Sequence, residues 1–361
     1  MKYLEEYRDP VLVKKLAAKI SATVTRRWNI MEICGGQTHS IMKYNLPELL
    51  PPEISLIHGP GCPVCVTPLE MINKALALAS MEEVILVTFG DMARVPGSSS
   101  DLLRARAEGA DVRIVYSPLD ALKIARNNLD RKVVFFAIGF ETTAPANALS
   151  VIKASEQNLD NYFVLCAHVL VPPALEAILS SGNTQINGLL APGHVCAITG
   201  YDQYSVFAQK YGLPVAVTGF EPVDIMKGIY ETVRQLELGL HTVENCYERS
   251  VKREGNPEAA ATMYEVFEVC DRQWRGIGLI PSSGLSVRSR YSNFDAEKHF
   301  DLTGIQTREA EVCIAGSVLQ GIARPSDCSA FGKSCTPEHP LGAPMVSSEG
   351  ACSAYFRYQK S

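Results

Sequence analysis

Val133-Val-Phe-Phe-Ala-Ile138 is a short run without a polar side chain, and an amphipathic stretch of helical length follows it at 145–157. Val84-Ile-Leu-Val-Thr-Phe89 is a similar run, apolar except for Thr88, ahead of 101–108. Strands that are apolar throughout and alternate with helices are typical of parallel sheets covered by helices on both faces. The sequence therefore predicts an α/β fold. Further strands are predicted at 54–57, 112–116, 162–166, 188–190 and 214–218, and further helices near 68–80, 118–129, 172–181, 196–211 and 222–240.

A short internal repeat suggests how the chain is divided. Gly139-Phe-Glu141 follows the strand predicted at 133–138, and Gly219-Phe-Glu221 follows the one at 214–218. The repeat predicts two similar α/β lobes with parallel sheets, although three matching residues can also arise by chance. A third domain, mostly helical or irregular, is expected to carry a cysteine-rich segment. The predicted ranges are 46–145 for the first lobe, 146–224 for the second, and 1–45 together with 225–361 for the third domain.

Four of the eleven cysteines lie near the C-terminus in a segment rich in Gly, Pro and Ser. They are Cys313, Cys328, Cys335 and Cys352. Four thiolates are the ligand set of a [4Fe-4S] cluster. Structural zinc usually takes close Cys-x2-4-Cys pairs, which this group lacks. The spacing favours an iron–sulfur cluster and leaves zinc, or thiols without a metal, as the alternatives.

A second group is the pair in Gly59-Pro-Gly-Cys62-Pro-Val-Cys65. The pair follows a predicted strand, and Thr67 and Glu70 have the spacing of a capping box for the next helix. Amides at a helix N-terminus favour thiolate over thiol, so Cys62 and Cys65 are predicted to be a redox-active pair. Metal binding by the pair and inert buried thiols are the alternatives.

Cys34 stands alone in Cys34-Gly-Gly-Gln-Thr-His39, after the apolar run Trp28–Ile33. Adjacent glycines let backbone amides approach a ligand closely. Gln37, Thr38 and His39 add an amide, a hydroxyl and an imidazole. These features are typical of a pocket for a small anionic or metal-bound ligand, although a lone cysteine is more often structural.

The composition excludes some classes of protein. With 34 Lys and Arg and 39 Asp and Glu, the net charge is −5 and there is no basic run, so we expect no nucleic-acid partner. No segment reaches the roughly 20 apolar residues that span a membrane, and the N-terminus lacks the pattern of a signal peptide. We therefore expect a cytoplasmic protein. In the reducing cytosol, many cysteines indicate metal or redox chemistry rather than a disulfide framework.

Several long motifs occur together, and in this combination the sequence resembles the HypD family of hydrogenase maturation proteins. The match extends over essentially the whole chain. The motifs are Cys34-Gly-Gly-Gln-Thr-His39, Gly59-Pro-Gly-Cys-Pro-Val-Cys65, Gly139-Phe-Glu-Thr-Thr-Ala144, Val217-Thr-Gly-Phe-Glu-Pro-Val-Asp224 and Gly342-Ala-Pro-Met-Val-Ser-Ser-Glu-Gly-Ala-Cys352.

The resemblance implies a scaffold on which the Fe(CN)2CO group of [NiFe]-hydrogenases is assembled, rather than a conventional turnover enzyme. It implies that Cys34 holds the iron together with a cysteine of a HypC-type small chaperone, while a HypE-type partner donates cyanide. Cys62 and Cys65 would be the redox dithiol. Cys313, Cys328, Cys335 and Cys352 would bind a [4Fe-4S] cluster.

Polar residues within these motifs are further candidates. His39, Thr142, Thr143 and Glu349 are predicted to orient ligands or protons, although each could be an ordinary cap or a satisfied hydrogen bond. His168 is expected to be a loop or core histidine. The competing function is a stand-alone iron–sulfur thiol–disulfide oxidoreductase that works through Cys62 and Cys65.

Overall fold

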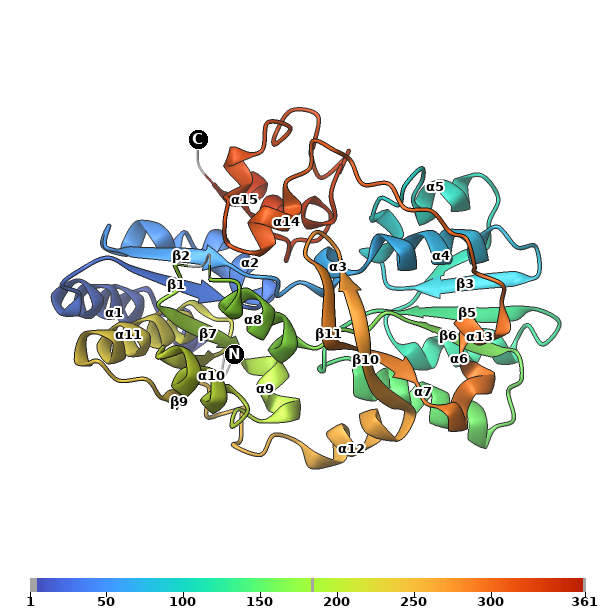
Figure 1. Cartoon of the computed structure of the whole chain (residues 1–361), viewed down its shortest axis with the longest axis horizontal. Coiled ribbons are helices and arrows are strands. Elements are labelled where there is room, and N and C mark those ends of the chain that lie inside the picture. The colour runs from blue at the N-terminus through green and yellow to red at the C-terminus, as the bar shows by residue number, and fades with distance from the viewer. Residues whose placement is uncertain (1–4, 183–184, 360–361) are drawn as a thin grey trace.

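The computed structural model describes residues 5–182 and 185–359, and it contains two parallel β-sheets side by side, each flanked by helices (Figure 1). The five-stranded sheet has the order β2 (Ile54–His58), β1 (Trp28–Glu32), β7 (Gly188–Pro192), β8 (Val215–Thr218) and β9 (Val243–Asn245). The four-stranded sheet has the order β4 (Val112–Ile114), β3 (Val84–Thr88), β5 (Lys132–Ala137) and β6 (Tyr162–Cys166). Every pair of neighbouring strands in these two sheets is parallel.

Helices cover both sheets, as the α/β prediction requires. The five-stranded sheet is accompanied by α1 (Pro10–Thr23), α2 (Gly35–Lys43), α8 (Val171–Ser180), α9 (Gly193–Thr199), α10 (Tyr204–Tyr211) and α11 (Pro222–Leu238). The four-stranded sheet is accompanied by α4 (Leu69–Ala79), α5 (Leu102–Ala107), α6 (Pro118–Arg126), α7 (Ala144–Glu156) and α13 (Ala296–His299). The short helix α3 (Pro63–Val66) lies between the sheets, and α12 (Pro257–Val266) packs on α7 and α9.

The rest of the chain joins the two sheets. An antiparallel hairpin of β10 (Phe267–Trp274) and β11 (Gly278–Val287) runs between them. The C-terminal segment, red in Figure 1, lies over one side of the molecule and contains α14 (Ala315–Leu319), the 3-10 turn η6 (Ala343–Met345) and α15 (Ala351–Tyr358). One continuous apolar core includes Met31 and Leu189 of the five-stranded sheet and Leu86 and Phe136 of the four-stranded sheet. The two sheets are therefore packed against a common core.

The five-stranded sheet combines strands from distant parts of the chain. Strands β1 and β2 come from the ranges assigned to the third domain and the first lobe, yet both belong to the five-stranded sheet. Strand β1 pairs with β2 on one side and with β7, far along the chain, on the other. As domain boundaries, the ranges 1–45, 46–145, 146–224 and 225–361 stay a prediction.

One helix prediction is wrong. The helix expected at 196–211 is two helices, because Gly200 has a positive φ of 75° and its Cα lies too close to the backbone of Arg253 for a side chain. The range 225–361, expected to be mostly helical or irregular, also contains the β10–β11 hairpin, which was not predicted. Strand β10 mixes charged and apolar residues, and β11 contains glycines, serines and a proline, so neither strand is an apolar run that the sequence pattern could identify.

His168 is a core histidine, as expected. Its ring is fully buried and lies 2.6 Å from the Asn147 amide nitrogen through Nε2 and 3.6 Å from Cys166 Sγ through Nδ1. Burial lowers its pKa to about 3, so the ring is neutral at pH 7. Within residues 5–182 and 185–359, no helix is long and apolar enough to cross a membrane.

Candidate functional site

Cys34 lies at the carboxyl end of β1, in the N-cap position of α2. Its side chain is buried, and Sγ lies 3.6 Å from Nδ1 and 3.9 Å from Nε2 of His194. His194 follows β7, which pairs with β1 in parallel. Because the carboxyl ends of neighbouring parallel strands meet at one edge of a sheet, two distant motifs bring a thiol and an imidazole together.

Both groups are uncharged at pH 7 in the absence of a ligand. Burial, aided by the negative charges of Glu349 and Glu32, raises the pKa of Cys34 well above its usual value. Burial lowers the pKa of His194 to about 4. The position at a helix N-terminus does not outweigh the loss of solvation. A bound cation would reverse this balance, since thiolates and neutral imidazoles are good ligands for transition metals.

The buried carboxyl group of Glu32 is hydrogen-bonded to the Cys34 loop. Glu32 is fully buried, and its Oε2 accepts a hydrogen bond of 3.0 Å from the Cys34 amide. Its Oε1 accepts a hydrogen bond from the Thr38 hydroxyl and lies 2.6 Å from Nδ1 of His58. Burial raises the pKa of Glu32, while its contact with His58 acts in the opposite direction. Glu32 thus ties the loop to the start of α2 and to the end of β2.

Replacing Glu32 with alanine should lower the free energy of unfolding by roughly 3–5 kcal/mol, because His58 loses its partner in a buried site and the Cys34 amide loses its acceptor. Urea unfolding followed by circular dichroism measures the change. Glu32→Gln keeps an acceptor oxygen and should lose less stability. A loss below about 1 kcal/mol in Glu32→Ala would contradict the supporting role.

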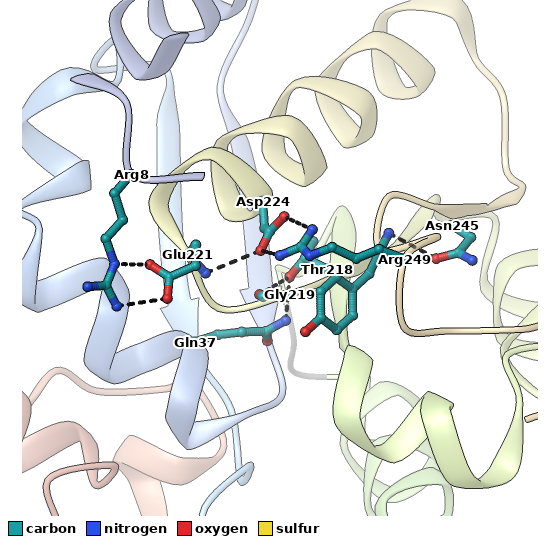
Figure 2. A network of polar contacts seen from close by, with 9 residues as sticks. Arg8, Gln37, Thr218, Gly219, Glu221, Asp224, Asn245 and Arg249 are labelled. Carbon is teal, nitrogen blue, oxygen red and sulfur yellow. Dashed lines mark hydrogen bonds and ion pairs between the residues drawn. The ribbon is translucent and has the colours of Figure 1, made fainter. Parts of the chain in front are cut away.

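Gln37 connects α2 to the strands that carry the neighbouring loops. Its Nε2 donates to Thr218 Oγ1 at 2.6 Å, and the Thr218 hydroxyl donates to the Gly219 carbonyl (Figure 2). The same Nε2 donates to the Ala191 carbonyl at 3.1 Å. Gln37 is fully buried, and its Oε1 has no hydrogen-bond partner in the described residues. The side chain therefore holds the Cys34 helix against the ends of β7 and β8.

The loop after β8 completes this side of the site. The Phe220 ring packs 5.2 Å from the His194 ring, measured between centroids, and a Cβ added to Gly36 would meet Phe220 at 3.1 Å. Figure 2 shows that ion pairs fix the loop, since Glu221 binds Arg8 and Asp224 binds Arg249 through both oxygens. The ion pairs of Glu221 and Asp224 therefore fix the loop that places the Phe220 ring beside His194.

The Cys62–Cys65 pair lies next to the Cys34 loop and forms a disulfide. Cys62 is the N-cap of α3, and its Sγ accepts a hydrogen bond of 3.2 Å from the Cys65 amide. The predicted capping box at Thr67 is wrong, because Thr67 ends α3 and donates to the Pro63 carbonyl, and α4 begins after Pro68. The pair does lie at a helix N-terminus. The helix is the short α3, which includes Cys65, and not the following helix α4.

Close glycine contacts bring three motifs together. The Gly35 amide donates to the Gly61 carbonyl at 2.8 Å. A Cβ added to Gly35 would lie 2.6 Å from the Glu349 carbonyl oxygen and 3.1 Å from Cys62 Cβ, so only glycine fits at this position. His39 Nδ1 lies 3.0 Å from the Ser348 carbonyl oxygen. The Cys34 helix, the disulfide and the C-terminal motif therefore meet at one place.

The four C-terminal cysteines line one pocket, together with apolar residues that include Phe331, Pro344 and Met345. The Leu341 amide donates to Cys335 Sγ at 3.4 Å, and a Cβ added to Gly342 would lie 2.4 Å from Cys313 Sγ, so a larger residue there would displace the cysteine side chain. Burial raises the pKa of Cys313 and Cys352, and the neighbouring thiols raise both further. In the part of the chain that the structure describes, no group of three or more His, Cys, Asp or Glu side chains is arranged to hold a single metal ion.

Thr142 and Thr143 lie elsewhere, at the carboxyl end of β5 in the four-stranded sheet. Thr143 is the N-cap of α7, and its hydroxyl lies 3.4 Å from the carbonyl oxygens of Ile138 and Phe140. Glu141 of the same motif is buried and caps α8, since its Oε1 accepts a hydrogen bond of 3.0 Å from the Val171 amide. The catalytic roles of Thr142, Thr143 and His39 stay predictions.

Sequence reasoning did not find His194, Glu32 or His58. Each lies at or just after the carboxyl end of β7, β1 or β2, which are neighbours in the sheet. The predicted strands at 54–57 and 188–190 already placed His58 and His194 close behind strand ends. The strand order, which identifies these ends as neighbours, was the missing information.

The comparisons with known proteins identify the family. The HypD model, described as "Hydrogenase formation hypA family", matches residues 11–359. The chain belongs to the HypD family. It is 46% identical to hydrogenase maturation factor HypD2 of Bradyrhizobium diazoefficiens, over 99% of this chain and 97% of that protein. It is 46% identical to HypD of Azotobacter vinelandii over the same shares of the two chains, and 44% identical to HypD of Escherichia coli over 100% of this chain and 99% of that protein.

Membership of this family confirms the resemblance seen in the sequence. The curated relatives carry the name hydrogenase maturation factor and match along nearly their whole length. The chain is therefore a hydrogenase maturation factor.

Proposed function

We propose that the chain is the scaffold on which the Fe(CN)2CO group of [NiFe]-hydrogenases is assembled. The observation that carries the proposal is that three thiol sites pack together. Helix α2, which begins after Cys34, packs against α15, which contains Cys352. Helix α3, which contains the disulfide, packs against η6, and η6 residues line the four-cysteine pocket.

Cys34 is the proposed ligand for the iron that is built up as cargo. A soft thiolate suits a ferrous ion that carries strong-field ligands. The His194 ring beside Sγ can accept a hydrogen bond from the thiol or orient the thiolate. A single buried thiolate leaves most positions on the iron for cyanide, carbon monoxide and a second protein ligand. That second ligand is proposed to be a cysteine of a HypC-type small chaperone.

The four-cysteine pocket fits a [4Fe-4S] cluster by its donor set. Four thiols in an apolar pocket, with an amide donating to one of the sulfurs, are the surroundings that such clusters have in proteins. The cluster would be held by Cys313, Cys328, Cys335 and Cys352. When bound, it would supply one electron at a time from an external low-potential electron donor.

The Cys62–Cys65 pair is proposed to deliver those electrons as a dithiol. Reduction of the disulfide takes two electrons and two protons and gives two thiols. Release of cyanide from a thiocyanate on a HypE-type donor takes two electrons and one proton, and gives one thiol and one cyanide ion. Oxidation of the dithiol back to the disulfide provides those two electrons. Cys62 is well placed for this exchange because it borders the Cys34 loop through Gly35.

The test is cyanide transfer in the purified complex of the chain with its small partner and an S-cyanylated donor. Cys62→Ser should slow the appearance of iron-bound cyanide in the infrared spectrum by about a hundredfold, because one serine prevents the disulfide from forming. Cys246→Ser, a buried cysteine outside the three thiol sites, is the matched control and should keep the wild-type rate. An unchanged rate in Cys62→Ser would overturn the redox role of the pair.

A further inference from the structure

The turn of the β10–β11 hairpin reaches the place where the disulfide helix meets the Cys313 segment. This turn is Arg275-Gly276-Ile277, and Figure 1 shows the hairpin running up to α3 below the C-terminal segment. The Arg275 amide donates to the carbonyl of Val66, the last residue of α3, at 2.9 Å. The backbone of the turn is therefore bonded directly to the helix that contains Cys62 and Cys65.

The Arg275 side chain binds the chain on the way to Cys313. Its Nε and Nη2 each donate to one oxygen of Glu309 at 2.8 Å, and Nη1 donates to the Pro96 carbonyl at 3.0 Å. The arginine side chain is 6% exposed and that of Glu309 is 45% exposed. A bidentate pair of this kind fixes orientation as well as distance. Arg275 thus anchors the segment four residues before Cys313.

A glycine contact anchors the same segment beyond Cys313. Gly276 in the turn and Gly316 in α14 approach so closely that a Cβ on Gly276 would lie 2.7 Å from Gly316 Cα. Gly276 also has a positive φ of 74°, which favours glycine. The hairpin turn therefore holds the Cys313 segment on both sides of the cysteine.

Arg275 and Glu309 lie beside the four-cysteine pocket, in a surface depression that they line together with Val312 and Leu341. The Leu341 amide donates to Cys335 Sγ, and Cys328 Sγ lies 3.7 Å from the Val312 carbonyl oxygen. The ion pair is therefore close to residues that contact two of the four sulfurs. The Arg275 side chain is mostly buried, so its charge is screened little by solvent, and loss of either member of the ion pair leaves the charge of the other uncompensated beside the pocket.

We propose that Arg275 is a positioning residue that couples the disulfide helix to the four-cysteine pocket and, as a pair with Glu309, sets the reduction potential of the cluster bound there. The inference rests on the proposed function. Reduction adds one electron to the cluster, so a nearby positive charge favours it and a nearby negative charge opposes it. The two members of the pair therefore act with opposite signs.

The experiment is a redox titration of the cluster in the intact protein, followed by electron paramagnetic resonance. Arg275→Gln leaves Glu309 uncompensated and should lower the equilibrium constant for one-electron reduction about tenfold, a potential about 59 mV more negative. Glu309→Gln leaves Arg275 uncompensated and should raise the constant, by less because Glu309 is half-exposed. The double variant should return toward the wild-type value, and Arg275→Lys, which keeps the charge, should remain near it.

Arg290→Gln removes an exposed arginine and serves as the control for a general change of net charge. The inference is overturned if the reduction potential moves in the same direction in Arg275→Gln and Glu309→Gln. It is also overturned if the potential moves in neither variant. If Arg275→Gln fails to fold, Glu309→Gln alone decides, because an unchanged or lowered potential contradicts the proposal. A wild-type protein without a cluster overturns the proposed cofactor as well, whereas a wild-type cluster with unmoved potentials overturns this inference alone.

Discussion

Replacing Cys34 with alanine is expected to abolish hydrogenase maturation in a host that depends on this chain. The side chain is 2% exposed and loses only its sulfur, so the fold should be retained. The iron loses its only proposed ligand from this chain. The loss should exceed the roughly 10–100-fold effects that follow mutation of groups hydrogen-bonded to a metal ligand. Hydrogenase activity of cell extracts, compared at equal amounts of the variant protein, measures the effect.

Cys246→Ala is the matched control for the Cys34 experiment. It removes another buried thiol of the five-stranded sheet region and should leave maturation intact. Full maturation with Cys34→Ala would contradict the scaffold. Combined with a loss of function in Cys62→Ser, that result would favour the iron–sulfur thiol–disulfide oxidoreductase instead.

Replacing Cys335 with serine is expected to eliminate the iron–sulfur cluster. Cys335 is the most deeply buried of the four pocket cysteines and already accepts an amide hydrogen bond from Leu341. Serine is a poor ligand for iron in this setting, and the segment around it has little regular structure to stabilise it without a metal. The anaerobically purified variant should lose the brown colour, iron and acid-labile sulfide of the wild type.

The control for this variant is Cys270→Ser, which changes a partly exposed cysteine on the β10 strand. It should keep its iron and sulfide. A wild-type protein that is colourless and contains zinc would contradict the cluster and favour a structural zinc site. Iron and sulfide that persist in Cys335→Ser would show that this cysteine is not a ligand.

Much of the fold could be predicted from local pattern. The strand predicted at 162–166 coincides with β6, and most other parallel strands differ from their predictions by a residue or two, because buried parallel strands are unbroken apolar runs. The partners of these strands could not be predicted. Strand β1 pairs with β2 and also with β7, which lies more than a hundred residues further along the chain, and nothing in the local sequence encodes that choice.

In the candidate site, too, local features could be predicted and contacts between distant segments could not. Cys34, Cys62 and Cys65 could be placed in turns next to strand ends from glycines and proline alone. His194 could not be assigned to Cys34, because their contact depends on β1 and β7 being neighbours. Arg275 was missed for a different reason. It lies in a short turn of a hairpin whose strands lack an apolar run, and its partners Val66 and Glu309 come from two other parts of the chain.

The most direct test of the scaffold is the infrared spectrum of the anaerobically purified chain, co-expressed with its small partner. Metal-bound cyanide and carbon monoxide absorb in a window where polypeptide does not. Cyanide and carbon monoxide bands are expected in the wild type, and they should disappear in Cys34→Ala and persist in Cys246→Ala. If wild-type protein that carries its iron–sulfur cluster shows no bands in this window, the result would contradict the scaffold role. It would favour the iron–sulfur thiol–disulfide oxidoreductase instead.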